Sequence, residues 1–148
     1  MVQRNNTMTN KKKKALLLEF SKIGEKVEIE LDDTQSPRTV GAIVDSLPLT
    51  MTIERWGDEL YSEATPVKVA EENARSEVCL FDVAYWPQGS ALCFFYGPTP
   101  ITSKAGKILP YSPVNIVGRI KSRPADIQDF LRRVEEAHVA ERVPVVLR

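Results

Sequence analysis

The fold class of this chain is best read from one stretch, Phe81-Asp82-Val83-Ala84-Tyr85-Trp86-Pro87-Gln88-Gly89-Ser90-Ala91-Leu92-Cys93-Phe94-Phe95-Tyr96. It holds six aromatic side chains, out of two Trp, four Tyr and five Phe in the whole chain. Aromatic and β-branched residues favour strands, and a Pro-Gln-Gly turn separates two such segments. The stretch therefore predicts paired strands, and its aromatic density marks a candidate surface for gripping a ligand.

On both sides of this stretch, alternating apolar and polar residues predict further strands. The predicted strands are 14–20, 27–31, 49–56, 59–62, 77–84, 91–96, 114–120 and 143–147. Two helices are predicted, one starting at Ser36-Pro37 and one at Ala125-Asp126; Ser36 suits the N-cap and Pro37 the first helical position. So many strands with so few helices predict a mainly β protein whose sheet closes into a barrel, with the helices over its open ends.

The hairpin around Gly57-Asp58 predicts an unusual outer surface. A two-residue turn places Trp56 opposite Glu59 and Glu54 opposite Tyr61. Since side chains alternate between faces, these four share the outer face of the sheet. The inner face then carries Leu49, Met51, Ile53 and Leu60. Two aromatic rings beside two carboxylates are not an ordinary solvated surface.

The strand 114–120 follows a long connection, 97–113, that contains four prolines. A loop of this length without its own secondary structure is either a functional lid or a rigid surface loop. Simple alternation along the strand places Val114, Ile116, Gly118 and Ile120 on one face. It places Asn115, Val117 and Arg119 on the other.

Charge is distributed unevenly along the 148 residues. Residues 1–14 carry five basic groups and no acid, and we expect them to form a disordered leader before a single domain, 15–148. The rest of the chain has 15 basic and 20 acidic residues, a net charge of minus five. An acidic body argues against general binding to nucleic acid, which needs a basic face.

Other classes are disfavoured by composition. No apolar run approaches a membrane span, and no apolar segment follows the basic leader, so a cytoplasmic protein without a membrane partner is predicted. Cys79 and Cys93 lack metal-ligand spacing and are expected to be reduced and buried. With one histidine and no phosphate-cradling glycine loop, neither a metal nor a cofactor is expected.

Several motifs resemble the cyclophilin fold: the helix start Ser36–Val40, and Gly89-Ser90 followed by Phe94-Phe95. The closer likeness is to an uncharacterised prokaryotic cyclophilin-like family, typified by a Thermotoga member. Its motifs are matched by Trp56–Tyr61, Asp82–Cys93, Tyr96–Pro100 and Val114–Arg119. The resemblance implies a closed eight-stranded barrel capped by two α-helices, with its functional surface outside one sheet.

The chain departs from true cyclophilins where their catalytic residues lie. The strand reading Phe-His-Arg and the following Phe-Met-x-Gln-Gly-Gly have no counterpart, and Arg55 only approximates the place of the arginine. Arg55 has inner parity at a strand end, where we expect it to reach the barrel rim. Any prolyl isomerase activity would therefore need a non-standard site.

The candidate ligand-binding residues combine outer-face residues with the two aromatics that precede the Pro87 turn. They are Trp56, Glu59, Tyr61, Tyr85, Trp86, Phe95, Asn115 and Arg119. Aromatic walls with a few polar anchors are the usual composition of a ligand site.

The sequence is compatible with three functions. The preferred one is binding of a peptide or small molecule in the aromatic groove. The second is prolyl isomerisation with Arg119 as donor to the twisted amide nitrogen. The third is an enzyme acting on a small molecule, with Glu59 or Asp82 as general base and Arg119 as anion clamp.

Overall fold

The computed structural model describes residues 13–103, 106–141 and 144–148. Most of the predicted leader, 1–12, and Val143 of the last predicted strand lie outside these ranges. The elements, in chain order, are β1 (Lys13–Phe20), η1 (Ser21–Ile23), β2 (Glu25–Asp32), α2 (Pro37–Asp45), β3 (Leu49–Trp56), β4 (Glu59–Ser62), β5 (Asp82–Trp86), β6 (Ala91–Phe95), β7 (Asn115–Ile120), α3 (Ile127–Glu141) and β8 (Pro144–Leu147).

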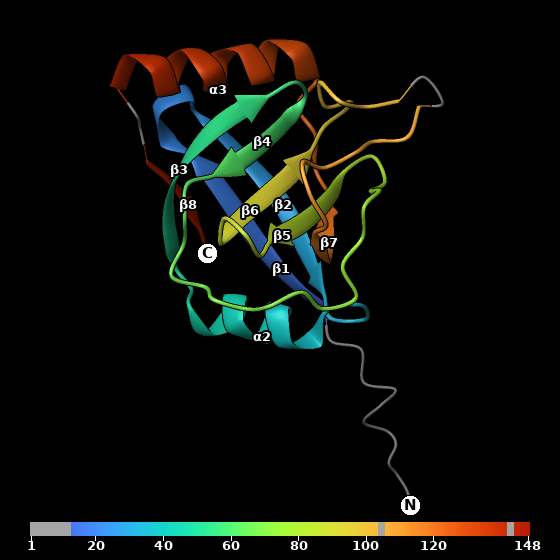
Figure 1. Ribbon diagram of the computed structural model, residues 1–148. Helices are drawn as coiled ribbons and strands as arrows, with labels where there is room; N and C mark the ends of the chain where they lie inside the picture. The colour runs from blue at the N-terminus through green and yellow to red at the C-terminus, as the bar shows by residue number, and fades with distance from the viewer. Residues whose placement is uncertain (1–12, 104–105, 142–143) are drawn as a thin grey trace, which may run out of the picture.

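The eight strands form a closed antiparallel barrel in the order β1-β2-β7-β5-β6-β4-β3-β8, with β8 pairing back to β1. Closure leaves no free sheet edge. Helix α3 lies across one end of the barrel and α2 across the other, as Figure 1 shows. The predicted mainly β, eight-stranded barrel capped by two helices is confirmed.

The barrel interior is filled by alternate side chains of every strand. In β1, for example, Leu16, Leu18 and Phe20 are buried, and both helices close the ends with apolar side chains such as Ile43 and Phe130. Phe130 packs edge-on against Phe20, with ring centroids 5.2 Å apart. Burial of these side chains is the main stabilising contribution to the fold.

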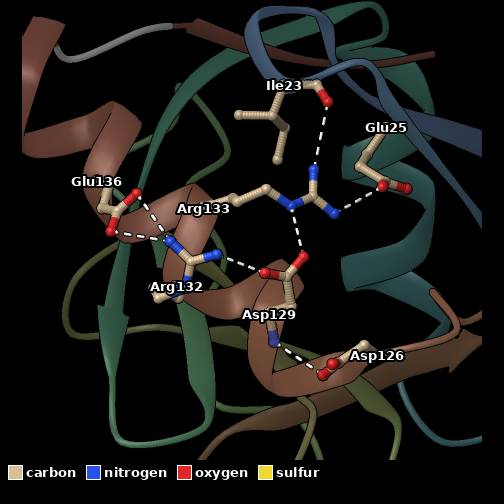
Figure 2. A network of polar contacts seen from close by, with 7 residues as sticks. All are labelled: Ile23, Glu25, Asp126, Asp129, Arg132, Arg133 and Glu136. Carbon is tan, nitrogen blue, oxygen red and sulfur yellow. Dashed lines mark hydrogen bonds and ion pairs between the residues drawn. The ribbon is translucent and has the colours of Figure 1, made fainter.

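A polar network fastens helix α3 to η1 and to the start of β2 (Figure 2). The Arg133 guanidinium donates to Glu25 Oε2 at 2.8 Å, to the Ile23 carbonyl at 3.3 Å and to Asp129 Oδ2 at 2.9 Å. Asp126 accepts from the Asp129 N–H at 3.0 Å and so caps the helix start, where the sequence placed it. These bonds set the position of α3 over the rim.

Simple alternation fails in β7. Val83 is opposite Gly118 but Ala84 is opposite Ile116, so Val117 is an extra residue, a β-bulge. Val117 consequently joins the barrel core, whereas Ile116 packs on the outside. The predicted set of Asn115, Val117 and Arg119 on one face is therefore wrong.

A second apolar cluster lies outside the barrel, over β5, β6 and β7. Its buried members are Val78, Ala84, Cys93, Phe95, Ile108, Val114 and Ile116. Isolated bridges between Arg75 and Val114 and between Val78 and Ile108 tie the two long connections together above these strands. The two connections thus cover the outer face of these strands. The predicted strand 77–84 begins only at Asp82, where β5 starts.

Candidate functional site

A pocket of about 190 Å³ opens on the outer face of the barrel, beside the second apolar cluster. Strands β3, β4, β5 and β6 and the end of the 97–113 connection form it. Its lining residues are Trp56, Glu59, Tyr61, Trp86, Cys93, Pro110, Tyr111 and Val114. We call it the aromatic pocket.

Strand pairing brings the barrel side of this pocket together. The Gly57-Asp58 turn places Trp56 opposite Glu59, and across the next pairing Tyr61 is opposite Cys93. Gly57 has a φ of 62°, and an added Cβ there would lie 2.7 Å from Pro100 Cδ, so glycine is required on both counts. The turn is also held by the Asp58 N–H, which donates to the Pro98 carbonyl at 2.9 Å.

Three aromatic rings form the wall. Tyr111 meets Trp56 and Trp86 edge-to-face, with centroids 6.1 and 5.8 Å away. The Trp86 indole N–H donates to Ser112 Oγ at 2.5 Å, which orients that ring. Tyr111 itself is 70% exposed, which is unusual for a large aromatic side chain.

Glu59 is the only ionisable carboxyl among the lining residues of the aromatic pocket, as far as the chain is described, and it is 5% exposed. Burial raises the pKa of its carboxyl from 4.5 to about 7, and a hydrogen bond with the Cys93 thiol offsets this only in part. Burial and the neighbouring Glu59 likewise raise the pKa of Cys93 well above its usual value. Oε1 of Glu59 has no hydrogen-bond partner among the described residues.

An unpaired buried acceptor is costly and calls for an explanation. A carboxyl near its pKa at neutral pH can accept a hydrogen bond, pair with a cation or exchange a proton. These are the chemical options that the aromatic pocket offers.

Of the eight candidate residues, four come together here: Trp56, Glu59, Tyr61 and Trp86. Phe95 has the predicted outward parity but lies wholly buried in the second apolar cluster beneath the covering chain. It supports the pocket from below and does not line it.

Tyr85 and Asn115 lie on the other side of the sheet. Tyr85 is buried in the barrel core, and its hydroxyl donates to the Val67 carbonyl at 2.6 Å. Because neighbours in a strand alternate, Tyr85 and Trp86 cannot both face one groove. Asn115 donates to Thr39 Oγ1 and accepts from the Glu72 N–H, at the α2 end of the barrel.

Arg119 faces outward but belongs to a separate polar groove with Asp82. Its guanidinium lies 3.9 Å from Asp82 Oδ1 and donates to the Leu80 carbonyl at 3.1 Å. Asp82 in turn accepts from the Cys79 N–H at 2.8 Å, so it fastens a turn. The bulge in β7 separates Asn115 from Arg119, and neither reaches the aromatic pocket.

Sequence reasoning did not name Cys93, Pro110, Tyr111 or Val114 as site residues. Cys93 could have been found, because it shares the parity of Phe95 on β6. The other three come from the end of the 97–113 connection and from Val114 beside it, and no local pattern says which strands they cover.

Within the described residues, no group of three or more His, Cys, Asp or Glu is arranged to hold a metal ion. The helices of that part of the chain include none long and apolar enough to cross a membrane.

Comparison with known proteins agrees with this architecture. The family model described as Cyclophilin-like matches residues 14–140. The solution structure of the hypothetical protein AF2241 from Archaeoglobus fulgidus is 44% identical, covers 76% of this chain and 83% of its own, and superposes with a TM-score of 0.64. McbB, solved in complex with tryptophan, is 20% identical and has a TM-score of 0.62, over 90% of this chain and 43% of its own. At this identity the likeness shows the fold alone.

No match was found among curated proteins. The extent of the family match and the identity to the archaeal protein lead to one conclusion: this chain belongs to the cyclophilin-like family.

Proposed function

We propose that this protein binds a small organic molecule, or one side chain of a peptide, in the aromatic pocket, with Glu59 as the polar anchor. The observation that carries the proposal is the unpaired Oε1 of a buried carboxyl that lines an otherwise apolar, aromatic-walled hollow. Ligand sites typically combine such apolar walls with a few placed polar groups.

The volume limits the size of the guest. A protein cavity of about 150 Å³ is large enough to hold benzene. At about 190 Å³, the aromatic pocket has room for one ring and a short substituent. Stacking or edge contacts with Trp56, Trp86 and Tyr111 would favour a planar guest.

The neighbour McbB suggests one probe. Its structure contains tryptophan, although at 20% identity the likeness extends only to the fold. Tryptophan and indole therefore belong in the first set of compounds to be tested on this chain.

A second candidate function is catalysis on a small molecule with Glu59 as general base. A carboxyl whose pKa is about 7 is partly ionised at neutral pH, which suits proton transfer. Asp82 and Arg119, the other residues considered for this role, lie in the separate groove. Arg119, the donor suggested for prolyl isomerisation, is likewise absent from the lining residues of the aromatic pocket.

The test is a titration of the full chain with small aromatic compounds, followed by the indole N–H signals of Trp56 and Trp86 in NMR spectra. We expect at least one of indole, tryptophan or benzylamine to shift both signals. Tyr111→Ala should weaken that binding about tenfold, because an aromatic pair contributes roughly 0.5–1.5 kcal/mol beyond its buried area.

Ile101→Ala is the matched control, since Ile101 is an exposed apolar residue of the same connection that does not line the pocket. It should bind like the wild type. If neither Trp signal responds to any compound at millimolar concentration, the proposed function is wrong.

A further inference from the structure

We propose, as a refinement that rests on the proposed function, that the ligand is a small protonated amine carrying a ring, whose N–H donates to Oε1 of Glu59 while its charge lies against the aromatic rings. The chemical class is an arylalkylamine cation.

The pocket is electrostatically one-sided. Its described lining residues include one carboxyl and no Lys, Arg or His. Lys107, on the same connection as Tyr111, pairs instead with Glu77 at 3.7 Å. An anionic guest would face the Glu59 charge without a counter-ion, so the pocket discriminates against carboxylates and phosphates.

One oxygen of the buried carboxyl is unsatisfied. The Cys93 thiol already hydrogen-bonds Glu59, while Oε1 has no partner in the described part of the chain. An N⁺–H donor makes a hydrogen bond roughly twice as strong as a neutral donor does. A quaternary ammonium group has no N–H to offer, so a primary or secondary amine fits this acceptor better.

The walls favour the same guest. Trp56, Trp86 and Tyr111 line the pocket, and a cation within about 6 Å of an aromatic ring face is attracted by its quadrupole. Tryptophan is the strongest aromatic partner in such contacts. A ring and an ammonium group together would use both the apolar space and the carboxyl.

Binding of a cation must be coupled to loss of a proton. Below about pH 7 most of the Glu59 carboxyl is protonated in the free protein, and the ammonium pairs with the ionised form. The balanced step is Glu59–COOH plus R–NH₃⁺ giving the Glu59–COO⁻ ammonium pair and one H⁺ released to solvent. Affinity therefore rises with pH up to about 7 and is level above it.

The other titratable groups around Glu59 are Tyr61 on β4, Cys93 on β6 and Tyr111 on the covering connection. Glu54 on β3 acts on Tyr61 through its charge. Burial and nearby carboxylates raise the pKa values of Tyr61 and Cys93, so both stay neutral in this range. The proton released on binding below about pH 7 is thus assigned to Glu59.

The experiment is isothermal titration calorimetry of the full chain with benzylamine, benzyl alcohol and benzoate, three probes of one shape and different charge. At pH 8 benzylamine should bind tighter than benzyl alcohol, and benzoate weakest. At pH 6 benzylamine should bind about tenfold more weakly than at pH 8. At pH 6, runs in two buffers of different ionisation enthalpy should give close to one proton released per benzylamine bound.

Glu59→Gln should remove the preference for benzylamine and its pH dependence, while its binding of benzyl alcohol shows that the pocket is intact. Glu54→Gln, on the same sheet face but outside the pocket, should keep both. If benzyl alcohol binds the wild type as tightly as benzylamine at pH 8, or no proton is released at pH 6, the amine assignment is overturned and the proposed function stands. If none of the three binds and the tryptophan signals are silent, both fall.

Discussion

Among single residues, Glu59 stands out as a buried ionisable group whose hydrogen-bonding capacity the fold only partly satisfies. A carboxyl that is 5% exposed and keeps one oxygen unpaired weakens the fold unless a ligand or proton satisfies it. Functional sites are where such local costs are retained. The outward position of Glu59 was readable from alternation, but its burial was not, because the residues that share its pocket lie as far along the chain as Val114.

The first prediction concerns stability against pH. The folded-state pKa of Glu59 is raised from 4.5 to about 7, so the folded protein holds a proton that the unfolded chain releases between these values. Stability contributed by this group therefore falls as pH rises from 4.5 to 7. Because Gln cannot ionise, Glu59→Gln should remove this loss. The difference in unfolding free energy, variant minus wild type, should therefore be about 3 kcal/mol larger at pH 8 than at pH 4.

Urea unfolding of both proteins at pH 4 and pH 8 measures it, because groups common to the two proteins cancel in the comparison. An equal difference in unfolding free energy at the two pH values would contradict the raised pKa of Glu59.

At the scale of elements, α2 shows how a distant residue replaces a local cap. The sequence predicted that Ser36 would accept a hydrogen bond at the N-terminus, but the Ser36 side chain makes no capping bond. The Glu72 carboxylate accepts from the N–H groups of Arg38 and Thr39 at 3.0 and 2.9 Å and from Thr39 Oγ1 at 2.7 Å. A buried carboxylate at this end also suits the helix dipole.

The second prediction is that Glu72→Gln loosens α2. Burial pushes the pKa of Glu72 upward, but hydrogen bonds from Thr39 and Arg38 outweigh it and hold the pKa below 4.5. Its stabilising effect is therefore present above pH 4.5 and lost as pH falls through the lowered value. Losing charge-assisted bonds should cost about 1–3 kcal/mol at pH 7 and less at pH 3.

Chemical denaturation at the two pH values measures this, with Glu71→Gln as control, since Glu71 is the exposed neighbour in sequence. A destabilisation that is the same at pH 3 and pH 7 would speak against a capping carboxylate.

The bulge in β7 changes which side chains of this strand share a face. One extra residue, Val117, moves Asn115 to the opposite side of the sheet from Arg119. Next to it, a Cβ on Gly118 would lie 2.1 Å from the Glu30 carbonyl oxygen, so the strands approach closely only because this residue is glycine. A glycine inside a strand pattern was the available hint that alternation would break here.

At the scale of the whole molecule, two apolar layers share the sheet. Among the described residues, the barrel core has 25 buried members and the outer cluster seven. The outer layer is covered by long connections held by isolated bridges, not by continuous strands. Regions with fewer buried apolar contacts open at lower free energy than the core.

The prediction is that the outer layer opens separately from the barrel. Amides of Val78 and Val114, which donate to the Ile108 and Arg75 carbonyls, should exchange with solvent through an opening less costly than that of the β1 and β2 amides. Native-state hydrogen exchange at increasing urea concentrations measures it, with the shallower urea dependence expected for Val78 and Val114. Exchange of all these amides through one global opening would refute a separate layer.

The amino-acid order alone determined the mainly β class, both helices, the Gly57-Asp58 hairpin with its facing pairs, and the outward side of Trp56, Glu59 and Tyr61. These follow from short-range rules, alternation in strands and turn chemistry, which act within a few residues. Tertiary structure alone decided that Asn115 and Tyr85 lie on the side of the sheet opposite the aromatic pocket, and that Phe95 is buried beneath the covering connections. It also brought Tyr111 to the pocket that Glu59 lines, because contacts between distant segments depend on how the barrel closes and where long connections cross it, and no local pattern carries that information.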